Sequence, residues 1–147
     1  MALDAANVGR TFIAPEPYLV GREKIREFAQ ATGETSPLCH DLAAARAAGH
    51  ADVVAPVTFP IVLTLKAMGE AVTDPSVGVD WSRVVHGDQR FSYRRPLVAG
   101  DELTVHTVIE SIKTLAGNDM ITLRGDLFDA AGLALGSTWT SLVQRGE

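Results

Sequence analysis

The sequence predicts an α+β fold in which an antiparallel sheet wraps around one buried central helix. Two observations support this fold class. Residues 57–72 form the most apolar stretch of the chain and carry the spacing of a helix. After Asp80 the apolar residues recur at every second position, which indicates strands separated by turns. A long helix that is apolar on most sides needs a sheet around it to bury its surface.

The first half of the chain is predicted to be mainly helical. A short strand is expected at residues 18–20, and from Gly21 the apolar spacing becomes helical, with one face formed by Ile25, Phe28 and Ala29. Gly33 follows this helix and is predicted to end it, because glycine readily adopts the left-handed conformation of a C′ residue. Asp41 is placed to cap a second, alanine-rich helix that runs to residue 48.

The central helix is predicted from Val57 to Val72. Its apolar side chains cover nearly the whole helical circumference, which indicates burial on most sides. Pro60 is compatible with a helix if Thr58 is the N-cap, because a proline in the first turn gives up no intrahelical hydrogen bond. Leu65 is therefore expected to pack in the interior, where truncation to alanine costs about 2–5 kcal/mol.

Four strands are predicted after Asp80, joined by turns that contain glycine. In the first of them, one face is expected to hold Val85, Gln89, Phe91 and Tyr93, and the other face His86, Asp88, Arg90 and Arg94. One small strand, helices, a buried helix and a four-strand antiparallel meander together make the arrangement called the hot-dog fold. The sequence contains no internal repeat or linker, so residues 1–147 are expected to form one domain.

Composition and charge narrow the classes of function. The chain has 147 residues, 46% of them hydrophobic and 21% charged, as in an ordinary globular protein. A net charge of −5 gives no electrostatic reason to expect a nucleic-acid partner. Cys39 is the single cysteine, so no intrachain disulfide forms, which fits a reducing compartment.

The sequence gives no sign of a membrane segment, metal site or cofactor. Met1-Ala-Leu-Asp4 lacks the features of a secretory signal, and the apolar run at residues 61–68 is too short to span a bilayer, so the chain is expected to be cytoplasmic. The four histidines show no paired metal-ligand spacing, and no phosphate-binding loop is present, so neither a metal nor a cofactor is expected.

Residues 33–41 read Gly-Glu-Thr-Ser-Pro-Leu-Cys-His-Asp. This segment resembles the motif Gly-Asp-x-Asn-Pro-x-His-x-Asp of the MaoC-like hydratases and dehydratases, a hot-dog family that acts on acyl thioesters. The match places Glu34 at the catalytic aspartate and Cys39 at the catalytic histidine, with His40 one position later. In that family the two groups activate water or remove a proton beside the thioester carbonyl. The resemblance implies Glu34 and His40 as catalytic candidates.

Two further segments carry the resemblance. Val54-Ala-Pro-Val-Thr58 is similar to the family's Ile-Ala-His-Gly-Met, which implies that the amides of Val57 and Thr58 bind the thioester carbonyl oxygen. Residues 86–103 look most like the first-half dehydratase domain and the non-catalytic subunits of two-component (3R)-hydroxyacyl-carrier-protein dehydratases. On this likeness His86 and Gln89 are candidate substrate-binding residues.

The resemblance implies a hydro-lyase subunit of fatty-acid metabolism that acts on 3-hydroxyacyl or 2-enoyl thioesters of coenzyme A or acyl carrier protein. A sister hot-dog subunit is expected to bring an intact Asp/His pair while this chain lines the acyl tunnel. A homodimer or heterodimer is expected, because an exposed sheet edge favours pairing. Two alternatives remain open: a non-catalytic acyl-thioester-binding subunit, and a hot-dog thioesterase in which Glu34 directs water at the carbonyl carbon.

Each candidate also has a purely structural interpretation. Glu34 is an ordinary solvated carboxylate in that interpretation, His40 a loop histidine and Cys39 a small buried apolar residue. His86 then satisfies a neighbouring strand. Three arginines follow it: Arg90, Arg94 and Arg95. They either bind the phosphates of a pantetheine carrier or simply lie exposed along a strand edge.

Overall fold

A computed structural model of the protein describes residues 3–146. Its helices are η1 (Ala5–Asn7), α1 (Arg22–Thr32), α2 (Pro37–His40), α3 (Leu42–Ala47), α4 (Ile61–Thr73) and η2 (Trp81–Arg83). Its strands are β1 (Thr11–Ile13), β2 (Tyr18–Leu19), β3 (Val84–Tyr93), β4 (Glu102–Leu115), β5 (Asn118–Phe128) and β6 (Ala134–Gln144). The N-terminal segment that was predicted not to be a secretory signal begins with Met1 and Ala2, and these two residues lie outside the described residues.

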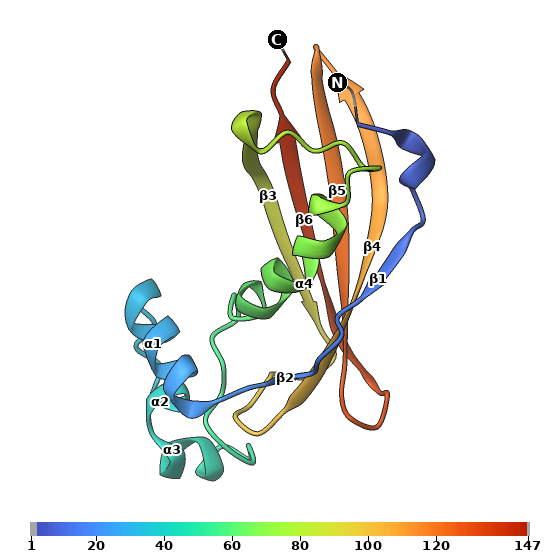
Figure 1. Ribbon diagram of the computed structural model, residues 1–147. Coiled ribbons are helices and arrows are strands. Elements are labelled where there is room, and N and C mark those ends of the chain that lie inside the picture. Colours follow the sequence, from blue (N-terminus) through green and yellow to red (C-terminus); the bar gives the residue numbers. More distant parts are fainter. Residues whose placement is uncertain (1–2, 147) are drawn as a thin grey trace.

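The strands form one antiparallel sheet in the order β1-β4-β5-β6-β3, and β2 also pairs with β4. Helix α4 lies against one face of this sheet, while α1, α2 and α3 gather at the end of the molecule opposite η1 (Figure 1). The predicted hot-dog fold is confirmed: a sheet curves around a central helix. The predicted meander is wrong in one respect, because β3 pairs with β6 and leaves β4 beside β1.

Strand β3 contains a bulge between His86 and Asp88 that changes which side chains face α4. The extra residue shifts the alternation by one position. His86 pairs with Leu142 and Gln89 with Thr140, so both lie on the inner face, and Val85 is instead 44% exposed on the outer face. The prediction that Val85 shares a face with Gln89, and that His86 opposes it, is therefore wrong.

Helix α4 begins later and is buried less completely than its composition suggests. Its first residue is Ile61, and the side chain of Thr58 makes no capping hydrogen bond, so the prediction of Thr58 as the N-cap is wrong. The buried residues of α4 are Leu63, Thr64, Ala67, Met68, Ala71 and Val72. Leu65 is 50% exposed, so the prediction that it packs in the interior is also wrong.

Two clusters of buried residues fill the space between α4 and the sheet. The first surrounds Phe59 and Leu63 near the start of α4, and the second surrounds Met68 and Val72 near its end. Gly125 of β5 lets the helix approach the sheet closely, because a Cβ at this position would lie 3.3 Å from the methyl group of Thr64. An alanine there would require Thr64 of α4 and Thr138 of β6 to shift by a few tenths of an ångström.

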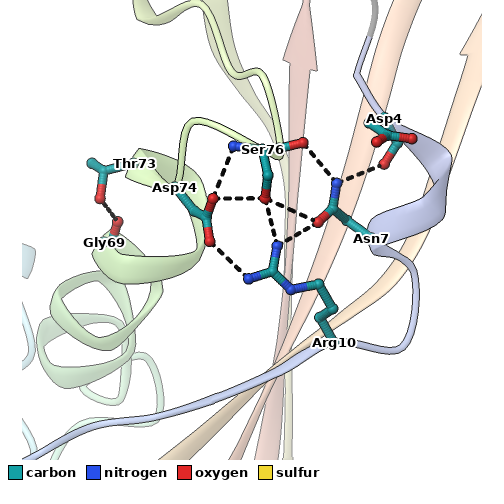
Figure 2. Close-up of polar contacts among 7 residues, drawn as sticks. All are labelled: Asp4, Asn7, Arg10, Gly69, Thr73, Asp74 and Ser76. Carbon is teal, nitrogen blue, oxygen red and sulfur yellow. Dashed lines mark hydrogen bonds and ion pairs between the residues drawn. The ribbon is translucent and has the colours of Figure 1, made fainter.

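The C-terminal end of α4 is fixed by a polar network that we call the N-terminal clamp: Asp4, Asn7, Arg10, Asp74 and Ser76 (Figure 2). The Arg10 guanidinium donates to the Asp74 carboxylate and to the Ser76 hydroxyl, each at 2.7 Å. The amide of the buried Asn7 side chain donates to the main-chain oxygen of Ser76 at 2.8 Å. The clamp ties the first described segment to the loop that follows α4.

Among residues 3–146, none of the helices has the length and apolar character that a membrane crossing requires. That all 147 residues form a single domain stays a prediction.

Candidate functional site

The motif loop at residues 33–41 begins where α1 ends. Gly33 adopts the left-handed conformation with φ of 72°, which confirms the prediction that it ends α1. The amide of Glu34 donates to the carbonyl of Ala29 at 2.8 Å and closes the end of the helix. This closure turns the chain sharply, so that residues 34–41 run back across the base of α1.

Hydrogen bonds within the loop hold it in shape. The Glu34 carboxylate accepts from the amide of Ser36 at 2.8 Å, and the Ser36 hydroxyl accepts from the amide of Leu38. At the other end, the Asp41 carboxylate accepts from the amide of Ala43 at 2.8 Å, which confirms Asp41 as the cap of α3. The carboxylate of Glu34 is thus part of the loop's own structure.

Cys39 and His40 occupy different environments. Cys39 is 6% exposed, and burial, reinforced by the nearby Glu34 carboxylate, raises the pKa of its thiol. His40 is exposed, and its Nε2–H donates to the main-chain oxygen of Glu34 at 2.7 Å. The structure brings Glu34 and His40 together, but the imidazole contacts the backbone of Glu34 rather than its carboxylate.

The segment before α4 is tied to the motif loop. The amide of Val54 donates to the carbonyl of Leu38 at 2.8 Å, and the amide of Ala55 donates to the carbonyl of Leu97 at the same distance. Within the described part of the chain, the amides of Val57 and Thr58 donate no hydrogen bond, and Val57 is 71% exposed. Two free N–H groups therefore lie just ahead of a helix, where they can bind a carbonyl oxygen that gains negative charge.

Sequence reasoning assigned no role to Tyr93, which the structure places beside this segment. Its hydroxyl donates to the carbonyl of Val57, and burial raises the pKa of the phenol. The contact joins the end of β3 to the peptide group that carries the free N–H of Thr58. The alternation of β3 put Tyr93 on the inner face, but only the tertiary structure identifies its partner.

His86 and Gln89 lie farther along β3, away from Val57. Gln89 precedes Tyr93 by four positions, or roughly 13 Å of extended strand, and His86 lies farther still from the end of β3 that contacts Val57. Nε2 of Gln89 is buried without a partner among the described residues, while its Oε1 accepts from Thr140 at 2.7 Å. An unpaired buried amide is costly, so it is a candidate contact for a ligand or a second subunit.

Among the described residues, no group of three or more His, Cys, Asp or Glu side chains gathers as metal ligands do. The site as found consists of one loop carboxylate, one neutral thiol, one exposed imidazole and two free amides.

Comparison with known proteins then places the chain in a family. The family model described as "FAS1-like, dehydratase domain region" matches residues 6–131. The chain belongs to this family. A UPF0336 protein of Streptomyces coelicolor is 54% identical over 145 residues, which cover 99% of this chain and 97% of that protein. The predicted membership of the MaoC-like hot-dog group is confirmed by these matches and by the structural neighbours.

Two solved structures resemble this FAS1-like dehydratase domain over nearly its whole length. A MaoC-like dehydratase superposes with a TM-score of 0.89 at 35% identity, and the match covers 96% of this chain and 43% of that one. The HadBC (3R-hydroxyacyl-ACP dehydratase) complex of Mycobacterium tuberculosis superposes with a TM-score of 0.87 at 29% identity, covering 97% of this chain and 99% of that one.

Proposed function

We propose that this chain is the acyl-binding subunit of a (3R)-hydroxyacyl-thioester dehydratase, or 2-enoyl-thioester hydratase, and that a sister hot-dog subunit completes its active site. The main support for the proposal is the side chain at position 39 of the motif loop. Cys39 stands where the family has its histidine, and it is a buried thiol with a raised pKa. Such a thiol stays protonated at neutral pH, so it cannot accept a proton from water.

His40 does not replace the missing imidazole in this geometry. Its Nε2–H is held by the main-chain oxygen of Glu34, and the Glu34 carboxylate accepts from the amide of Ser36. General acid–base catalysis needs both groups within reach of one water molecule. The chain therefore retains a carboxylate without the second proton-transfer group.

The free amides of Val57 and Thr58 provide hydrogen-bond donors for the carbonyl oxygen of a thioester. Hydration of a 2-enoyl thioester places negative charge on the carbonyl oxygen, and two preorganised N–H donors stabilise that charge. Tyr93 holds the intervening peptide by donating to the carbonyl of Val57. We assign these residues to binding and polarising the thioester, and the sister subunit to proton transfer.

The partner is proposed to pair along β3. This strand ends the sheet order, and within the described residues its outer edge has no strand beside it. Val85 and Leu65, on β3 and α4, are 44% and 50% exposed, and the buried amide of Gln89 is unpaired. A second hot-dog subunit paired along β3 would cover Val85 and Leu65, and the similar protein HadBC is described as a complex. The proposed complex works in the cytoplasm, where Cys39 stays reduced.

The test is to purify the chain with the hot-dog protein encoded beside it and to follow crotonyl-CoA hydration by loss of the enoyl absorbance. We expect the complex to exceed the isolated chain by about 10²–10⁴-fold, the usual contribution of general acid–base catalysis. A matched control replaces the motif histidine of the sister subunit by alanine, which should return the complex to the level of this chain alone.

The same assay separates the alternatives. Release of free thiol from crotonyl-CoA would indicate a thioesterase, and acyl-CoA binding without either reaction would indicate a non-catalytic binding subunit. Full hydration by the isolated chain that Glu34→Gln abolishes would overturn the division of labour.

A further inference from the structure

The three arginines of β3 and of the turn that follows it differ in what holds their guanidinium groups. Arg90 lies over the ring of Trp139, with its guanidinium carbon 4.0 Å from the ring centroid. Arg95 donates two hydrogen bonds to the Asp101 carboxylate, at 2.8 and 2.9 Å, and these bonds raise its pKa. Arg94 is exposed, and within the described part of the chain its side chain makes no ion pair, hydrogen bond or ring contact. Its charge is therefore available to a ligand.

The position of Arg94 is fixed by its main chain. The amide of Arg94 donates to the carbonyl of Leu135 at 2.8 Å, which extends the pairing of β3 with β6 by one residue beyond Tyr93. The side chain of Tyr93 lies on the inner face of the sheet, where its hydroxyl donates to the carbonyl of Val57. Because side chains alternate along a strand, Arg94 projects toward the outer side of the same edge.

A hollow of about 250 Å³ lies between this end of β3 and the segment that precedes α4. Ala55, Pro56 and Val57 form one side, and Tyr93 and Arg94 form the other together with the turn at residues 95–97. The prolines of this wall have no N–H to donate, whereas the amide of Val57 is free. A residue with a free amide and a residue with a free guanidinium therefore border the same hollow.

Arg94 also borders a second hollow, of about 280 Å³, on the outer side of the sheet. Asp126, Phe128 and Ser137 are among the residues that line it. The Asp126 carboxylate already accepts hydrogen bonds from Arg124 and from the Ser137 hydroxyl, at 3.1 and 2.7 Å. Arg94 thus stands on the ridge between the two hollows, and a ligand too long for the first hollow must pass over it.

The charges around this ridge favour an anion. The chain as a whole has a net charge of −5, but Arg95 and Asp101 offset each other and leave the charge of Arg94 uncompensated. A guanidinium can donate two parallel hydrogen bonds to the oxygens of a phosphoryl group, which is the geometry that arginine provides and lysine does not. A thioester carrier that enters the first hollow ends in such a group, because its pantetheine arm is phosphorylated at the end away from the sulfur.

From this arrangement we infer that Arg94 binds the phosphoryl group at the end of the pantetheine arm, while the arm itself lies in the hollow that Val57 lines. The inference rests on the proposed function and names the residue through which this chain recognises the carrier of the acyl group. The phosphoryl group is common to coenzyme A and acyl carrier protein, so Arg94 serves thioesters of both. It discriminates against thioesters whose arm has no phosphate.

Four saturated thioesters test the inference, because they lack the double bond that hydration requires. The probes are butyryl-pantetheine, butyryl-4′-phosphopantetheine, butyryl-CoA and butyryl acyl carrier protein, each titrated calorimetrically into the full chain, alone and with its sister subunit. We expect the phosphopantetheine thioester to bind about three- to tenfold more tightly than the pantetheine thioester, as an exposed pair of charge-assisted hydrogen bonds allows. The difference should shrink in about 0.5 M salt, which screens exposed charges.

Three variants locate the phosphoryl group. Arg94→Ala should lower the affinity for the three phosphorylated probes by about three- to tenfold and leave butyryl-pantetheine unchanged. Arg94→Lys should keep part of the preference, since it retains the charge without the paired hydrogen bonds. Arg90→Ala is the matched control, because it removes an exposed arginine from the same strand whose guanidinium lies over Trp139. It should leave all four affinities unchanged.

The outcomes separate the inference from the function on which it rests. A loss of affinity in Arg94→Ala that includes both carriers and phosphopantetheine, but not pantetheine, supports the inference. An equal loss for all four probes would make Arg94 a structural part of the hollow, and a loss confined to one carrier would place it against the nucleotide or the carrier protein; either result overturns the inference. Unchanged affinities would also overturn it while thioester binding stands. Absence of binding of every probe in both preparations would overturn the proposed function as well.

Discussion

The two ends of helix α4 differ in whether their polar groups have hydrogen-bond partners within the protein. At the C-terminal end, Asn7, Arg10, Asp74 and Ser76 donate to and accept from one another in the N-terminal clamp (Figure 2). At the N-terminal end, the amide of Thr58 has no partner within the described chain. The polar groups at the clamped end are paired within the protein, whereas the exposed amide of Thr58 at the other end remains available to a ligand.

The largest expected effect contrasts two apolar residues of α4. Met68→Ala should lower the free energy of unfolding by about 2–5 kcal/mol, because Met68 is 2% exposed in the second cluster of buried residues, near the end of α4. Leu65→Ala should cost under about 1 kcal/mol in the isolated chain, because Leu65 is 50% exposed. Urea unfolding of both variants measures the difference. Equal losses would mean that α4 is buried on both sides.

The clamp itself is tested by Asn7→Ala. The substitution removes the side-chain amide that donates to the main-chain oxygens of Ser76 and Asp4, which leaves buried groups unpaired. We expect a loss of about 1–3 kcal/mol in the free energy of unfolding. Acyl-CoA affinity should be unchanged, since the clamp lies at the opposite end of α4 from the free amides. A variant as stable as the wild type would show that the clamp does not hold this end.

Tyr93→Phe tests the open end. It removes the hydroxyl that donates to the carbonyl of Val57 and keeps the ring in place. The expected cost is about 0.5–1.5 kcal/mol in stability, with weaker acyl-CoA binding because the neighbouring amide of Thr58 is less well fixed. Thermal unfolding and calorimetry measure the two effects. If affinity stays at the wild-type value while stability falls, Tyr93 supports the fold without positioning the amides.

Asp74, one of the two acidic residues of the clamp, makes a smaller, pH-dependent contribution to stability. Hydrogen bonds from the Ser76 hydroxyl and amide, and from Arg10, lower the pKa of Asp74 from 3.8 to about 2. A carboxyl group with a depressed pKa stabilises the fold above its unfolded pKa, and the effect is lost as the pH falls through the folded value. The Tm should therefore fall between about pH 4 and pH 2, and Asp74→Asn should fall less over that range. Identical pH profiles would exclude Asp74 as a contributor.

The smallest effect is expected at the motif loop. His40→Ala and Cys39→Ser should each leave hydration by the complex within about twofold of wild type, because neither side chain contributes a proton-transfer group in the proposed mechanism. Cys39→Ser is the matched control for a thiolate mechanism, which would make that variant inactive. A loss of two orders of magnitude in His40→Ala would make His40 the catalytic imidazole.

Local patterns correctly predicted the end of α1 and the cap of α3, but they did not predict the start of α4 or the features that depend on tertiary structure. Gly33 and Asp41 act through hydrogen bonds to residues within a few positions, so the sequence alone identifies their roles. The bulge at His86 and the placement of β3 beside β6 depend on distant partners. A single missed residue in β3 was enough to reverse the predicted faces of Val85 and His86.

The residues of the candidate site also fall into two groups, those that the sequence suggested and those that only the structure identified. The resemblance suggested Glu34 and Cys39 from residues 33–41 and the amide of Thr58 from residues 54–58, because each of these two segments is a contiguous pattern. It gave no sign of Tyr93, whose partner Val57 lies far away in the sequence. The exposure of Leu65 could not be predicted from the sequence either. The apolar pattern of a helix is the same whether a strand of the same chain or a second subunit covers that side.

The sheet order has a consequence for how the protein is made. Among the described residues, β1, β2 and β3 form no pairs with one another. Strands β1 and β2 pair only with β4, and β3 pairs only with β6, the last of the described strands. Pairing between segments so far apart in sequence makes folding slow. A chain leaving the ribosome thus carries the apolar helix α4 and an unpaired β3 until β6 has been synthesised, and it is exposed to aggregation throughout that interval. The time that β3 spends without β6 is therefore a second determinant of how much protein folds, beside the stability of the finished fold.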